Sequence, residues 1–419
     1  NWLFTYKQNC TCYANSRSNN LYSLYMNILY VSSIYPGMSN MCNGEIINHS
    51  MPGFSKVYNK MIHDGHSIDL VIALPLEDKK NLCLSEISGR VSLVTWSNRY
   101  YIDGISSFIK LLLCVYKITS SKKYDLLYGH GPIGVLGNII ARFKGIRFGH
   151  RVYGSASLYS DLKINKFGVF TAFLKHPLQF LSFFLKKDFM IVTNDGSKSN
   201  KVHKIIGLNS YSFFHWRNGV DFNNSEKKHD FSEEYGRFLL YPARFLQVKN
   251  QDIAIDMVFN FNKTYDHSIN LVLIGDVSDR AYFDEIKQKV KDLNLSENVF
   301  ILPSVPASEL FDFYKSSFAV LSLNRFSNFG NISIEALTAG CVLISFNDGS
   351  LDQVITHNES GMLINNMEHG VDILNSLYID VKFRKNIQKA AESSAKLNFL
   401  SWNDRVDKEV FLIEKPLSK

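Results

Sequence analysis

Residues 318–340 read FAVLSLNRFSNFGNISIEALTAG and contain the pattern around which the rest of the chain is organised. The apolar run at residues 318–323 has the length and composition of a buried parallel strand. Apolar residues then recur at helical spacing until Gly340, which predicts a helix that ends there. The stretch therefore predicts a strand, a glycine-containing loop and a helix whose free backbone N–H groups face the carboxyl end of the strand.

A glutamate and two cations are candidates for binding a ligand at this edge. Glu335 lies about one turn into the predicted helix, where its carboxylate could accept two hydrogen bonds from a diol such as a ribose. Arg244 and Lys249 follow an earlier predicted strand at residues 238–241, and two cations so placed can clamp a diphosphate. An ordinary βα unit with solvated charges fits each feature taken alone. The prediction depends on all three side chains opening onto the same edge of one sheet.

The composition is that of an ordinary soluble globular protein. The 419 residues, 46% hydrophobic and 20% charged, are enough for two domains. No apolar run approaches the ~18 residues of a membrane span, and the first residues lack the pattern of a signal peptide. The six cysteines show no metal-ligand spacing apart from the isolated pair Cys10 and Cys12, so we expect reduced thiols in a cytoplasmic protein, and no metal site.

Charge is divided unevenly along the chain. Residues 1–225 contain 25 Lys and Arg against 12 Asp and Glu, whereas the remainder contains 21 against 27. A basic first half predicts an anionic partner, which could be a phosphorylated substrate, an acidic membrane surface or nucleic acid. The sequence carries no recognised nucleic-acid-binding motif, so nucleic acid is the least favoured of the three.

Predicted strands and helices alternate throughout the chain, which is typical of parallel sheets with helices on both faces. Residues 1–25 are polar and aperiodic, and we expect an N-terminal extension that precedes the first strand. A polar run that begins at residue 223 reads as a linker, so we place a first domain at 26–222 and a second at 223–400. Further strands are predicted at 68–73, 125–128, 148–152, 189–193, 238–241, 270–274, 299–302, 318–323 and 342–346, and loops of the first domain at 35–53, 129–132 and 153–160.

Residues 166–187 combine six phenylalanines with four lysines. A basic aromatic helix can lie in a membrane interface with its rings in the acyl boundary. It can equally be a core helix with a rim of lysines, although Pro177 interrupts this one. The positive charge of the first half favours contact with an anionic membrane.

Taken together, the motifs resemble the GT-B glycosyltransferases, and more narrowly the retaining glycosyltransferase family 4. The resemblance runs from about Met26 to Phe411. It implies two Rossmann-like α/β domains that face each other across a cleft, with a helix at 401–419 that packs back on the first domain. Its most specific part is Phe329-Gly330-x4-Glu335-Ala336-Leu337-x2-Gly340, and the supporting matches are Asn218-Gly219-Val220-Asp221, Arg244, Lys249, Leu273-Ile274-Gly275-Asp276, Gly349, Gly361-Met362-Leu363-Ile364 and Trp402.

The resemblance implies a role for each matching residue. Arg244 and Lys249 would hold the diphosphate of a nucleotide-sugar co-substrate and stabilise the charge that develops on it, which needs no metal or cofactor. Glu335 would bind the ribose, and no catalytic base is assigned. Other donor contacts would come from Ser327, Asn328, Phe329, Gly330 and Asn331, the base would lie near Ser304 and Val305, and the acceptor cleft would include Gly37, His130, Arg151, Tyr153 and Gly154.

Two positions depart from the family pattern. The family usually carries a glutamate where this chain has Ser327, and a serine brings no charge and a shorter reach. It also often has a histidine where this chain has Tyr153, for which His130 and Arg151 could partly substitute. These departures affect the expected donor sugar and, to a lesser degree, activity itself.

The resemblance implies a hexosyltransferase that moves a sugar from a nucleotide-diphosphate donor to a glycan or lipid-linked glycan in bacterial surface polysaccharide synthesis. The enzyme would work at the inner face of the plasma membrane, with the basic aromatic segment on anionic lipid. The departures leave open a catalytically weak subunit that binds a partner protein or a glycan. A sugar epimerase of similar architecture is less favoured, because the donor pattern is retained.

Overall fold

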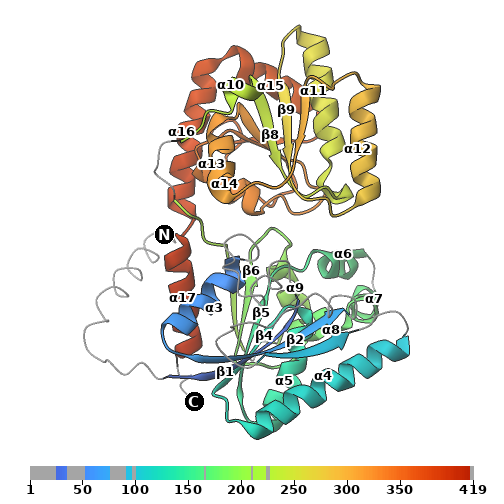
Figure 1. Ribbon diagram of the computed structural model, residues 1–419, viewed down its shortest axis with the longest axis vertical. Helices are drawn as coiled ribbons and strands as arrows, with labels where there is room; N and C mark the ends of the chain where they lie inside the picture. Colours follow the sequence, from blue (N-terminus) through green and yellow to red (C-terminus); the bar gives the residue numbers. More distant parts are fainter. Residues whose placement is uncertain are drawn as a thin grey trace, which may run out of the picture.

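The protein consists of two α/β domains, each built on one parallel sheet, which lie end to end in Figure 1. The computed structural model describes residues 25–34, 52–75, 91–96, 101–164, 167–208, 211–222 and 227–415. Residues 1–24 of the extension expected at 1–25, most of the loop at 35–53 with Gly37, and linker residues 223–226 lie outside the described residues.

The first domain has a seven-stranded sheet in the order β3-β2-β1-β4-β5-β6-β7. Helices α3 (Pro52–His63) and α17 (Trp402–Glu414) cover one face, and α4 (Tyr101–Ser121), α5 (Val135–Lys144) and α8 (Pro177–Phe184) cover the other. α6 (Ala156–Ile164), α7 (Gly168–Lys175) and α9 (Ser199–Ile206) pack with α8 beside β5 and β6. The strands are β1 (Asn27–Ser33), β2 (Ser67–Pro75), β3 (Val91–Trp96), β4 (Leu126–His130), β5 (Arg147–Val152), β6 (Phe189–Thr193) and β7 (Ser212–Trp216), and the 3-10 turn η2 (Pro132–Gly134) follows β4.

The second domain has a six-stranded parallel sheet in the order β10-β9-β8-β11-β12-β13. Its strands are β8 (Phe238–Pro242), β9 (Asn270–Ile274), β10 (Val299–Leu302), β11 (Ala319–Ser322), β12 (Leu343–Phe346) and β13 (Met362–Ile364). One face is covered by α11 (Gln251–Tyr265), α12 (Arg280–Asp292) and α15 (Met367–Ile379). The other face is covered by α10 (Ser232–Tyr235), α13 (Ala307–Ser316), α14 (Asn331–Thr338) and α16 (Val381–Asn398), and the 3-10 turn η3 (Gln247–Lys249) precedes α11.

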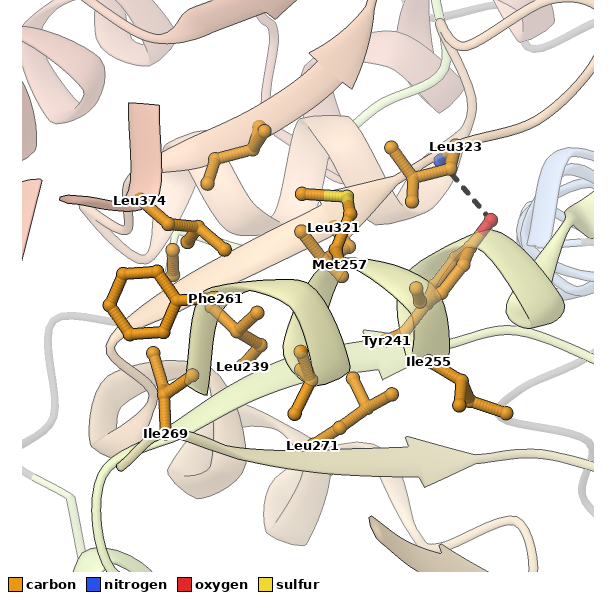
Figure 2. Close-up of a cluster of buried hydrophobic side chains, with 14 of the residues drawn as sticks. Leu239, Tyr241, Ile255, Met257, Phe261, Ile269, Leu271, Leu321, Leu323 and Leu374 are labelled. Carbon is orange, nitrogen blue, oxygen red and sulfur yellow. Dashed lines mark hydrogen bonds between the residues drawn. The ribbon is translucent and has the colours of Figure 1, made fainter. Parts of the chain in front are cut away.

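Figure 2 shows the core on one face of the second sheet. Leu239, Leu271 and Leu321 come from three neighbouring strands and lie against Met257 and Phe261 of α11, all without solvent exposure. Because helices cover both faces of the sheet, β8 is buried at all five positions. This is the physical reason why its sequence is a continuous apolar run rather than an alternating one.

The structure confirms every predicted strand and adds three more. β3 and β7 are edge strands that are mostly not buried, so each carries a weaker apolar signal. β13 is fully buried but has only three residues, which is a short run to recognise. The predicted loop at 129–132 is wrong in part, because Gly129 and His130 are the last residues of β4. Residues 167–187 form two short helices, α7 and α8, that meet at His176, since Pro177 opens the second.

The chain crosses between the domains twice, and the two crossings lie side by side. Val220 N donates to Leu400 O at 3.0 Å, and Trp402 N donates to Val220 O at 3.0 Å. After the second crossing, α17, which is drawn in red in Figure 1, packs along the first domain beside α3. Val406, Val410 and Ile413 are buried there in the core of the first domain.

Candidate active site

The two sheets present their switch points, where the chain order along the sheet reverses, at β1/β4 and at β8/β11. Ligands of doubly wound sheets bind beyond the carboxyl ends of the strands at such points. In the second domain, the loops after β8 and β11 are linked by Tyr241. Its hydroxyl donates to Lys249 O and accepts from Leu323 N at 3.1 Å, the bond drawn in Figure 2.

Arg244 and Lys249 both lie in the loop after β8, the former exposed and the latter half-buried in η3. Burial lowers the pKa of Lys249, and the neighbouring charge of Arg244 lowers it further. Asn250 fixes the end of this loop, because its side chain donates to Leu323 O at 2.8 Å and accepts from Arg325 Nε at 2.9 Å. Two cations held this close repel each other, and an anion between them would relieve the repulsion.

The loop after β11 is held by hydrogen bonds to Asn328, which is fully buried. Asn328 N donates to Asp348 at 3.0 Å, and Asn328 Oδ1 accepts from Asn324 N at 2.9 Å. Phe329 is also buried, so neither side chain is available to a ligand. A Cβ added to Gly330, by contrast, would meet no atom within 4 Å. The backbone at the start of α14 is therefore accessible.

Glu335 projects from the second turn of α14 and is half-buried. Burial raises its pKa to about 7, even though a hydrogen bond from the Tyr314 hydroxyl at 3.0 Å opposes the shift; the charge of Asp221 adds to it. Because β8 and β11 are adjacent, Glu335 and the two cations open onto the same edge. Ser304 and Val305 follow β10, two strands from β8, where the Ser304 hydroxyl donates to Asp276.

In the first domain, the predicted cleft residues that the structure describes lie at the carboxyl ends of β4 and β5 or directly after β5. His130 is fully buried and shares a 2.9 Å hydrogen bond with the Tyr153 hydroxyl. Burial and the charge of Arg151 keep the pKa of His130 well below its ordinary value, so its ring is neutral at pH 7. Arg151 is also fully buried, 4.7 Å from the Tyr153 ring and 3.4 Å from Glu409 of α17, which leaves Tyr153 as the more accessible group.

The two edges meet across a seam between the domains. The Ser327 hydroxyl donates to Asp195 O, and Lys198 Nζ donates to Gly349 O at 2.8 Å. Asn218 Nδ2 donates to Asn331 Oδ1 at 3.0 Å. No sequence pattern marked residues 194–197 as part of a site. Contacts between positions more than a hundred residues apart leave no local signal from which Asp195 could have been found.

Comparison with known proteins finds a family similar to the second domain. Residues 221–394 match the family described as glycosyl transferases group 1.

The match covers the second domain alone, and it shows the family that this domain is similar to.

The D-inositol 3-phosphate glycosyltransferase of Paenarthrobacter aurescens (strain TC1) is 24% identical to this chain over 160 residues, 38% of this chain. The matching segment spans about two fifths of the length of that relative (39%).

Solved structures show the same fold over nearly the whole chain. Sucrose-phosphate synthase from Thermosynechococcus elongatus superposes with a TM-score of 0.72 at 13% identity, over 93% of this chain and 98% of that one. Anabaena HepE in complex with UDP-glucose superposes with a TM-score of 0.65 at 16% identity, over 92% and 99%. The GT-B fold predicted from the sequence is therefore confirmed. Among the described residues, no helix is long and apolar enough to cross a membrane.

Proposed function

We propose that the protein is a retaining glycosyltransferase that transfers a hexose from a nucleotide-diphosphate sugar to a glycan or lipid-linked glycan. The observation that carries the proposal is that Arg244, Lys249 and Glu335 share one edge at the β8/β11 switch point. That edge lies within residues 221–394, which match the glycosyl transferases group 1 family. A GT-B neighbour is known in complex with UDP-glucose, which supports a donor of this class.

The proposed chemistry is electrostatic. Arg244 and Lys249 hold the diphosphate and offset the negative charge that grows on it as the bond to the sugar breaks. A cation pair can do this without a metal or a cofactor, and Glu335 accepts hydrogen bonds from the ribose hydroxyls. We assign no protein base for the acceptor hydroxyl.

We also propose that the first domain selects the acceptor and brings the enzyme to an anionic membrane, as in bacterial surface polysaccharide synthesis. Support comes from α7 and the residues around it. Residues 162–187 contain five lysines and no acidic residue, although Lys187 is buried and Lys175 pairs with Asp161. Phe167, Phe170 and Leu174 of this segment are 73%, 62% and 60% exposed, which is unusual for a core helix. Exposed rings among lysines suit the inner face of a plasma membrane.

The donor site is tested by Lys249→Ala in a thermal-shift and calorimetric panel of UDP, GDP and ADP with their sugars. At a hundredfold excess over its dissociation constant, a bound nucleotide should stabilise the wild type by about 2.7 kcal/mol. We expect Lys249→Ala to lose at least tenfold in affinity, because one of the two charges on the diphosphate is gone.

Lys263→Ala is the matched control, since Lys263 is exposed near the other end of α11. It should respond to the nucleotide like the wild type. If no nucleotide stabilises the wild type, or if Lys249→Ala binds as tightly as the wild type, the proposed donor site is wrong.

A further inference from the structure

A turn of the first domain contacts residues 327–331 of the second domain, which we call the donor loop. This turn, residues 194–197, follows β6 and receives the Ser327 hydroxyl on Asp195 O. Gly196, which follows Asp195, has φ +86°. A Cβ added to Gly196 would lie 2.6 Å from Ser350 Cβ and 3.3 Å from Phe329 Cβ. The close approach requires a glycine, so the seam is built to place residue 195 against the donor loop.

The Asp195 side chain is held in place from its own domain. Its Oδ1 accepts from Ser197 N at 3.0 Å, which closes a tight turn. Its Oδ2 lies over Gly154, where a Cβ would come within 2.5 Å of it. Gly154 is one of the predicted cleft residues, and its missing side chain makes room for this carboxylate. The pKa of Asp195 is raised, because burial outweighs the hydrogen bonds from Ser197 and the charge of Arg151, which oppose the shift.

The other carboxylates near the donor loop, those of Asp348 and Glu335, already accept hydrogen bonds from the protein. Asp348 uses Oδ2 to accept from Asn328 N at 3.0 Å and Oδ1 to accept from Ser350 N at 2.9 Å, so both oxygens fix the backbone. Glu335 lies further along, on α14, and accepts from Tyr314. The donor loop itself, residues 327–331, contains no acid. A sugar in front of this loop presents several hydroxyl donors, for which a carboxylate is the strongest acceptor.

We propose that Asp195 of the first domain binds hydroxyls of the donor sugar across the seam, so that both domains together determine which sugar is accepted. The proposal rests on the proposed function, since it concerns the sugar of the same nucleotide donor. It assigns Asp195 to the sugar alone. The diphosphate and the ribose are left to the second domain.

The experiment is isothermal titration of wild type and Asp195→Asn with UDP, GDP and ADP and with UDP-glucose, GDP-glucose and ADP-glucose. Asparagine keeps the size of the side chain but replaces one acceptor by a donor. We expect Asp195→Asn to bind the nucleotide within twofold of the wild type and to lose tenfold or more in affinity for the nucleotide sugar. Asp188→Asn is the control, because Asp188 accepts from Phe148 N at the amino end of β6, the opposite edge of the sheet.

A second variant tests whether the lost affinity comes from the missing carboxylate or from a disturbed structure. Because the Ser327 side chain ends at residue 195, adding Ser327→Glu to Asp195→Asn returns a carboxylate to the seam, and we expect at least part of the lost affinity to return. The proposal is overturned if Asp195→Asn binds the nucleotide sugar like the wild type, or if the nucleotide and its sugar weaken equally. If the wild type binds neither, the proposed function fails and this inference fails with it.

Discussion

At the level of single residues, Glu335 is protonated more readily than an ordinary glutamate, whereas its proposed role in binding favours the ionised form. Its carboxyl is proposed to bind the ribose, but burial and the charge of Asp221 disfavour its ionised form. With a folded pKa of about 7 against an ordinary value of 4.5, the folded protein binds a proton more tightly than the unfolded chain does. The contribution of Glu335 to stability is therefore complete below pH 4.5 and is lost as the pH rises towards 7.

Glu335→Gln should remove this loss, because the amide is neutral at every pH and its oxygen can still accept from Tyr314. We expect the variant to gain on the order of 1–3 kcal/mol relative to the wild type between pH 4.5 and pH 8. Urea unfolding at both pH values measures the difference. Nucleotide affinity should fall at the same time, since the amide accepts fewer hydrogen bonds from the ribose. Glu297→Gln, at an exposed loop position, is the control, and an equal pH response from it would contradict the argument.

At the level of elements, α17 belongs to the first domain although the chain reaches it last. Its Glu409 is fully buried and accepts from the Tyr128 hydroxyl at 2.7 Å and from Arg405 at 2.8 Å. It also lies 3.4 Å from Arg151, so the carboxylate balances two buried guanidinium groups beneath the cleft. Removing one partner of such a group would leave an uncompensated buried charge. The helix thus holds Arg151, one of the predicted cleft residues, in place through Glu409.

The exposed face of α7 should decide membrane binding. We expect wild-type protein to sediment with vesicles that contain anionic phosphatidylglycerol and to be released by salt, since lysines supply part of the attraction. Phe170→Ser combined with Leu174→Ser should weaken this binding about tenfold, because two exposed apolar side chains no longer enter the acyl boundary. Phe411→Ser, half exposed on α17, is the matched control. Salt-insensitive sedimentation, or an equal loss in the control, would remove the membrane part of the proposed function.

At the scale of the whole molecule, the relative position of the two domains depends on the pair of crossings. Gly219 packs against the second crossing so tightly that a Cβ would lie 2.7 Å from Trp402 Cα. Arg217 donates to Asn398 O at 2.9 Å on the other side of the same contact. These groups fix the position at which α17 begins. They therefore also determine the relative position of the two sheet edges that carry Asp195 and Ser327.

Gly219→Ala should therefore destabilise the protein by roughly 1–3 kcal/mol, because a methyl group would displace backbone that cannot move independently. Thermal and denaturant unfolding measure the loss. Gly330→Ala is the stability control: its φ is −100° and its Cβ would point into open space, so its unfolding should match the wild type. If the two variants unfold alike, the crossing tolerates movement and does not fix the domain arrangement.

The sequence by itself determined the βα alternation, the central strands of both sheets and the edge on which Arg244, Lys249 and Glu335 lie. These features follow from apolar runs and from the loops directly after them, which are local properties of the chain. Only the tertiary structure decided that Asp195 meets Ser327, 132 residues away, and that Glu409 lies under Tyr128, 281 residues away. Such contacts depend on how the sheets and the final helix pack, and a pattern read along the chain carries no record of packing between distant segments.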